Sequence, residues 1–116
     1  METQSTSHKD CYIAVILFES SSNVSDYKPL YQECFVLILA NSLESAKEKT
    51  LVYAQSQEIS YQNENKQMIT WSLKQIVDVN SVLYDEFNNG TELYARHFRN
   101  YQAYSLFEPL LSGEEL

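Results

Sequence analysis

Two carboxylates, Glu19 and Glu33, are the residues of this sequence whose type and spacing best suit chemistry. Each lies near one end of an apolar run. If the two runs form paired antiparallel strands, both carboxylates come to the same end of the sheet, where they can act as an acid and a base with separate pKa values. Arg96 and His97 can join them, which makes these four side chains the candidate ligand-binding site. A solvated strand end with a salt bridge is the competing interpretation.

Other catalytic centres have less support. A nucleophilic cysteine needs an adjacent base, which His97 could supply to Cys34 across a sheet. Cys34 lies in a Phe-Val-Leu-Ile segment, however, and that setting is typical of an inert core thiol. Cys11 and Cys34 lack the close spacing of zinc ligands, so we expect no metal site. We also expect no cofactor, and the sequence favours a non-enzymatic protein.

The composition describes one acidic globular domain. The 116 residues are 44% hydrophobic and 13% aromatic, with nine tyrosines, which suffices for a single core. The formal net charge of −8 opposes binding to nucleic acid or to anionic membranes. It suits solubility or a basic protein partner. The polar N-terminal segment lacks a signal-peptide pattern, and no run is long enough to span a membrane, so we expect a cytoplasmic protein with reduced cysteines.

Two apolar segments, residues 11–19 and 31–40, predict strands because they are rich in β-forming side chains. Both segments are apolar on both alternating faces, and such a strand is usually central in its sheet. Residues 20–30 between them are polar and rich in serine, which predicts a loop.

The hydrophobic period then changes, and a helix is predicted over residues 42–58. Asn41 or Ser42 can cap its first turn, and Asn41 with Glu44 has the spacing of a capping box. A narrow apolar stripe at helical spacing must pack on the sheet. The stripe consists of Leu43, Ala46, Thr50, Tyr53 and Ala54.

A second pair of strands is indicated further along the chain. Ile59 and Tyr61 can begin a short strand before a polar turn. The segment 68–79 alternates between apolar and polar residues, which predicts a long strand with one buried and one wetter face, interrupted near Gln75. The predicted buried face consists of Ile69, Trp71, Leu73, Val77 and Val79.

The C-terminal part of the chain begins with the pair Asn89 and Gly90, which is typical of a tight turn. The segment Thr91–Phe98 predicts a last strand. Beyond it, five apolar residues have the spacing of a short helix or a docked segment that ends near Pro109. These are the candidate interface residues Tyr101, Tyr104, Phe107, Leu110 and Leu111.

Together the elements predict an α+β fold. We expect an antiparallel sheet of about four or five strands, in the order β-β-α-β-β, with one main helix on one face and a short C-terminal helical segment. Residues 1–10 are expected to be a disordered tail, residues 11–98 the single domain, and residues 99–116 an extension. The extension should dock on the domain or on a partner.

Four short motifs follow one another along the chain. They are Tyr12-Ile13-Ala14 with Leu17-Phe18-Glu19; Glu33 with the segment Ala40 to Ala46; Tyr61 and Trp71 with Val77-Asp78-Val79; and Asn89 to Arg96. In this order and spacing they resemble the small bacterial family called domain of unknown function 4288. The chain departs from that pattern at Cys11, where an aromatic residue is expected, and at Ala95, where a serine is expected. The resemblance implies a compact antiparallel α+β domain of the bacterial cytoplasm, with no assigned activity and no catalytic residues.

The predicted strands carry more apolar surface than one amphipathic helix can cover, which predicts a further contact with the C-terminal segment or with a second copy. We therefore predict a non-enzymatic interaction or regulatory domain that acts through protein–protein association as a homodimer. One alternative is a small ligand-binding domain or a carboxylate-dependent enzyme that uses Glu19 and Glu33. Another is an acidic inhibitor or immunity-type protein that binds a basic partner.

Overall fold

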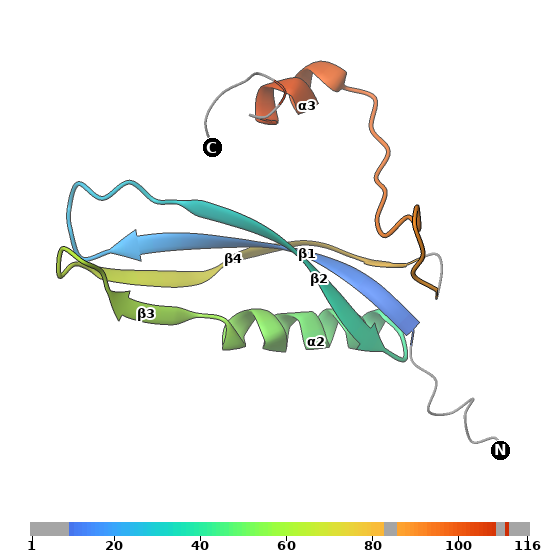
Figure 1. The fold of residues 1–116 in the computed structure, drawn as a ribbon, viewed down its shortest axis with the longest axis horizontal. Coiled ribbons are helices and arrows are strands. Elements are labelled where there is room, and N and C mark those ends of the chain that lie inside the picture. The colour runs from blue at the N-terminus through green and yellow to red at the C-terminus, as the bar shows by residue number, and fades with distance from the viewer. Residues whose placement is uncertain (1–9, 83–85, 109–110, 112–116) are drawn as a thin grey trace.

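The computed structural model describes residues 10–82, 86–108 and 111 (Figure 1). In this part of the chain, four antiparallel strands form one sheet, and two helices accompany it. The prediction of an α+β fold with the element order β-β-α-β-β is confirmed. The elements are β1 (Asp10–Ser22), β2 (Tyr31–Ala40), α2 (Leu43–Ser56), β3 (Ile59–Gln62), β4 (Met68–Ser81) and α3 (Tyr101–Phe107).

The strand order in the sheet is β2-β1-β4-β3, so β1 is central, as predicted. β2 is an edge strand, which contradicts the expectation from its two apolar faces. β1 pairs with β2 on one side and with β4 on the other. Ala14, Val15 and Ile16, in the middle of β1, are all buried. Burial of consecutive residues means that both faces of β1 are covered at this point, because successive side chains of a strand point to opposite faces.

Helix α2 packs on one face of the sheet, which we call the inner face (Figure 1). Of the two predicted caps, Ser42 is the one used: its Oγ accepts a hydrogen bond of 3.0 Å from the backbone N–H of Ser45. Ala46, Thr50 and Ala54 are buried, and their small side chains let the helix approach the sheet closely. Leu43 is exposed, so the predicted apolar stripe is wrong at its first member.

The inner face and α2 together form the hydrophobic core. The buried core residues are Tyr12, Ala14, Ile16, Phe18, Ile38, Ala40, Ala46, Ala54 and Val79. Cys34, Val36, Tyr53, Trp71, Leu73 and Ile76 are partly buried against them.

β4 is irregular, as the predicted interruption near Gln75 anticipates. Its register with β1 shifts twice, so that Val77 and Lys74 have no partner in β1. Each shift is a bulge that changes which side chains face the core. Ile76 packs against the core while Val77 is 41% exposed, so the prediction that Val77 is buried is wrong.

The segment Thr91–Phe98 is not a strand, which contradicts the sequence-based prediction. It contacts the opposite, outer face of the sheet through the Tyr94 side chain, and residues 92, 93 and 95–98 are exposed. The Tyr94 ring lies 5.8 Å from that of Phe35 in β2, and its hydroxyl donates a 2.6 Å hydrogen bond to Asp78 in β4. Gly90 has a φ of +89°, which agrees with the predicted turn at Asn89 and Gly90.

Helix α3 follows this segment and agrees with the predicted C-terminal helix. The side chain of Asn100 caps it by accepting a 3.0 Å hydrogen bond from the backbone N–H of Ala103. No helix within residues 10–82, 86–108 and 111 has the length and apolar character needed to cross a membrane.

Candidate functional site

The first group of candidate residues lies on the outer face, at the end of the β1–β2 pair. The Glu19 carboxylate accepts a 3.0 Å hydrogen bond from the Tyr31 hydroxyl and lies 3.4 Å from the Lys74 ammonium. Tyr31 is the cross-strand partner of Glu19, and Lys74 is one of the bulged residues of β4. The hydrogen bond to Glu19 is the main cause that raises the pKa of Tyr31 above its usual value.

Glu33 shares this face with Glu19. Its cross-strand partner is Leu17, two residues before Glu19, so the two carboxylates are diagonal neighbours on the outer face. The antiparallel pairing that the sequence suggested thus brings Glu19 and Glu33 to one face. Glu33 is exposed to solvent. Glu19 already interacts with Tyr31 and Lys74.

Tyr94 links three strands further along the outer face. Its partners Phe35 and Asp78 are the residues that pair with Val15 from either side, so the Tyr94 side chain spans the row that contains buried Val15. Partial burial, followed by the hydrogen bond to Asp78, raises the pKa of Tyr94. This residue was not among the predicted site residues, because a tyrosine in an apparent strand gave no signal of such a role.

The predicted basic residues take different positions. The Arg96 guanidinium lies 6.0 Å from the centre of the Tyr94 ring, a cation–π geometry at the limit of such contacts. The charges of Arg96 and Glu33 both influence the pKa of Tyr94, which places all three groups in one neighbourhood. His97 is exposed and makes no hydrogen bond, ion pair or ring contact with the described residues.

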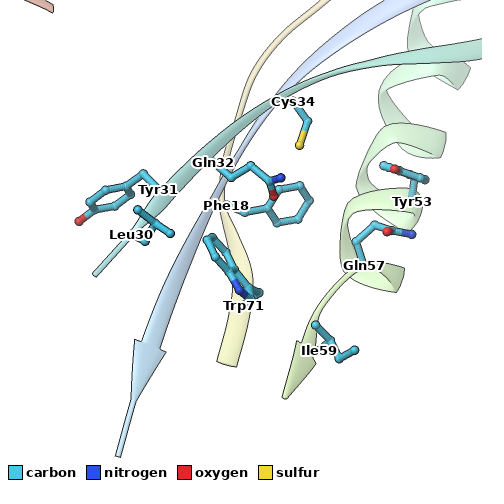
Figure 2. A pocket seen from close by; sticks show the side chains of 9 residues that line it. All are labelled: Phe18, Leu30, Tyr31, Gln32, Cys34, Tyr53, Gln57, Ile59 and Trp71. Atoms are coloured by element: carbon cyan, nitrogen blue, oxygen red, sulfur yellow. The ribbon is translucent and has the colours of Figure 1, made fainter. Parts of the chain in front are cut away.

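A groove of about 600 Å³ lies on the inner face, where α2 ends and β3 begins (Figure 2). Figure 2 shows Phe18 and Trp71 at its floor and Tyr53 and Gln57 projecting from α2 toward them. None of its nine lining residues is charged. Phe18 and Cys34 alternate along their strands with Glu19 and Glu33, so the groove and the two carboxylates lie on opposite faces of the sheet. Tyr31, at the edge of the sheet, both lines the groove and donates to Glu19.

The sulfur of Cys34 points into this groove (Figure 2). Burial, and then the negative charge of Glu33, raise the pKa of the Cys34 thiol. A raised pKa disfavours the thiolate, which is the form that acts as a nucleophile or metal ligand. Nowhere in the part of the chain that the structure describes do three or more His, Cys, Asp or Glu side chains gather in a way that could hold a metal ion.

Exposed apolar side chains are spread over several elements of the described chain, and two groups of them bear on the predicted interface. The first is the outer row of β2, which we define as Phe35, Leu37 and Leu39; Phe35 is 63% exposed and both leucines are 49% exposed. The second is α3 with Leu111, where four of the five candidate interface residues lie: Tyr101, Tyr104, Phe107 and Leu111 are all exposed. The fifth, Leu110, lies outside the described residues. The sequence signal for the outer row of β2 was present, since residues 31–40 are apolar on both faces.

Comparison with known proteins finds one family. A sequence model with the description Domain of unknown function (DUF4288) matches residues 11–95. No curated protein matches the chain. No solved structure matches it.

Proposed function

The chain belongs to the family described as Domain of unknown function (DUF4288), and we propose that it is a non-enzymatic association domain that works as a homodimer. The observation that carries this proposal is the outer row of β2. A soluble monomer rarely presents large apolar side chains side by side, and contiguous patches of this kind usually mark an interface.

The position of β2 strengthens this interpretation. β2 is an edge strand, and within the described residues β1 is its only partner in the sheet. Edge strands of monomers are commonly protected by charges, proline or bulges. From Cys34 to Ala40, however, β2 carries no charged residue and no proline, and its pairing with β1 is regular. Lys49 of α2 donates a 2.9 Å hydrogen bond to the Leu39 carbonyl of this strand, and a second protein surface would cover its exposed apolar side chains.

The polar groups of the chain support a non-enzymatic role. Glu19 is held by Tyr31 and Lys74 on an open surface, so its carboxylate already has two partners and does not lie in an enclosed site. The raised pKa of Cys34 disfavours its thiolate at neutral pH. Binding through apolar contacts requires none of these groups to react.

Light scattering coupled to size-exclusion chromatography tests the proposal. We expect the full chain to elute at micromolar concentration with twice the mass of one chain. Leu37→Glu should shift it to the monomer, because a charge placed in a buried apolar interface is strongly unfavourable. Gln32→Glu, which adds the same charge to an exposed position of β2 on the groove side, is the matched control and should remain dimeric.

A wild-type chain that stays monomeric at all accessible concentrations would contradict the proposal. So would a Leu37→Glu variant that keeps the wild-type mass. Circular dichroism of each variant confirms that the fold is intact when its mass is measured.

A further inference from the structure

We propose that two copies exchange their C-terminal helices, so that α3 of each copy packs on the outer row of β2 of the other. This inference rests on the homodimer proposed above and adds the segment that covers the exposed row. The partner of α3 is therefore a second copy of this chain.

Helix α3 has no partner of its own. It contacts no other helix or strand among the described residues, and Figure 1 shows it set apart from the sheet on the side opposite α2. Leu106 is 87% exposed and Phe107 is 69% exposed. A helix of one to two turns is marginal in water by itself and gains its stability from packing an apolar face. A binding surface outside the same chain would supply this stabilisation.

The segment that precedes α3 holds the first turn of the helix in place. Phe98, in the segment before α3, stacks on Tyr104 with 4.8 Å between the ring centres. Together with the Asn100 cap, this stack holds the first turn of the helix against its own connection. Leu106 and Phe107 lie beyond the stack and remain available to a partner.

The two exposed surfaces together approach the area of a stable interface. Since an aromatic side chain has about 150–250 Å² to bury, we estimate that the exposed apolar area on each copy is roughly 700 Å². A stable interface buries about 800 Å² per partner, so two exchanged contacts approach this standard. The side chains that contribute are Phe35, Leu37, Leu39, Tyr101, Leu106 and Phe107.

The charges are also compatible with this pairing. Two copies with a net charge of −8 repel each other, and contact surfaces without charges add no like-charge pairs at the interface. The segments Cys34–Ala40 and Tyr101–Phe107 contain no charged residue. Arg99 precedes the helix and Glu33 precedes the outer row, so one pair of opposite charges flanks the two surfaces, while Glu108 follows the helix at its other end.

A complementation experiment tests the exchange. Leu106→Glu damages the helix and Leu37→Glu damages the outer row, and each variant alone should dimerise at least tenfold more weakly than wild type. Mixed in equal amounts, the two variants should form a heterodimer, because one of its two contacts joins an intact helix to an intact row. Differently tagged copies and light scattering measure this recovery.

Controls separate this inference from the homodimer itself. Gln102→Glu adds the same charge to α3 at an exposed polar position and should dimerise like wild type. A Leu106→Glu variant that dimerises like wild type would overturn the helix exchange while leaving the homodimer intact. Failure of the mixed variants to associate, when both are folded by circular dichroism, would also overturn the exchange. A monomeric wild-type chain would overturn both proposals.

Discussion

The two faces of the sheet are covered by different structural elements, although both faces share the central strand β1. On the inner face, Ala46 and Ala54 let a whole helix lie close to β1, and Ile16 is completely buried. On the outer face, Val15 is buried to nearly the same degree, yet the cover there is a segment without regular structure that is anchored by Tyr94. The outer row of β2 stays exposed beside it. A helix closes a broad surface, whereas one anchored side chain closes a single row.

The largest effect that tests this contrast should come from the inner face. Ile16→Ala removes a fully buried side chain from the centre of the core. Its neighbours on two strands and a helix cannot collapse into the space, so we expect a loss of about 2–5 kcal/mol in the free energy of unfolding. Urea denaturation at a fixed protein concentration measures this loss.

Val77→Ala is the control for that measurement. Val77 lies at a bulge of β4 and is exposed, so its truncation should cost less than about 1 kcal/mol. A Val77→Ala variant as destabilised as Ile16→Ala would show that the bulged side of β4 is part of the core, which would remove the contrast between the two faces.

The inner face was also the part of the molecule that the sequence predicted best. The helix stripe, the two long strands and the β-β-α-β-β order all follow from hydrophobic period, because these elements bury one continuous surface. The outer face was predicted less well. The segment Thr91–Phe98 has β-forming residues, but composition does not tell whether a sheet edge is free to receive it. The sequence predicted an interruption near Gln75, but a simple alternation of apolar and polar residues did not predict that the bulge turns Val77 outward.

The candidate carboxylates show the same limit of sequence reasoning. The sequence predicted that antiparallel pairing would bring Glu19 and Glu33 to the same end of the sheet, and the register adds that they share its outer face. The partners of Glu19 could not be predicted, since Lys74 reaches it from a bulge. The groove beside Cys34 could not be predicted either, because it depends on where α2 ends above the sheet.

A second test addresses the anchor of the outer face. Tyr94→Phe keeps the ring against Phe35 and removes the hydrogen bond to Asp78. Because this bond has a charged acceptor but is partly exposed, we expect a loss of about 1–2 kcal/mol in the free energy of unfolding. Tyr61→Phe removes a hydroxyl without a hydrogen-bond partner among the described residues and should be neutral.

The partly buried Tyr94 hydroxyl also makes the free energy of unfolding depend on pH. The pKa of Tyr94 is higher in the folded chain than its usual value of 10.0. Its contribution to stability is therefore fully present below pH 10 and is lost as the pH rises through the folded value. Unfolding free energies measured across this range should fall less steeply in Tyr94→Phe than in wild type. Equal slopes in the two proteins would show that Tyr94 does not anchor the outer face.

The smallest effect is expected at the exposed end of the outer face. Lys74→Met removes the ion pair with Glu19, and because both side chains are partly exposed the loss should stay below about 1 kcal/mol and shrink in high salt. The positive charge of Lys74 lowers the pKa of Tyr31, so the variant should also titrate Tyr31 at a higher pH. NMR with the Tyr31 ring resonances assigned can follow this one residue among the nine tyrosines. Lys47→Met makes the same charge change on α2, where the described residues offer no ion pair, and should alter neither quantity. A salt-independent loss as large as that of Tyr94→Phe would mean that Lys74 packs as part of a closed outer face, and the contrast between the two faces would no longer hold.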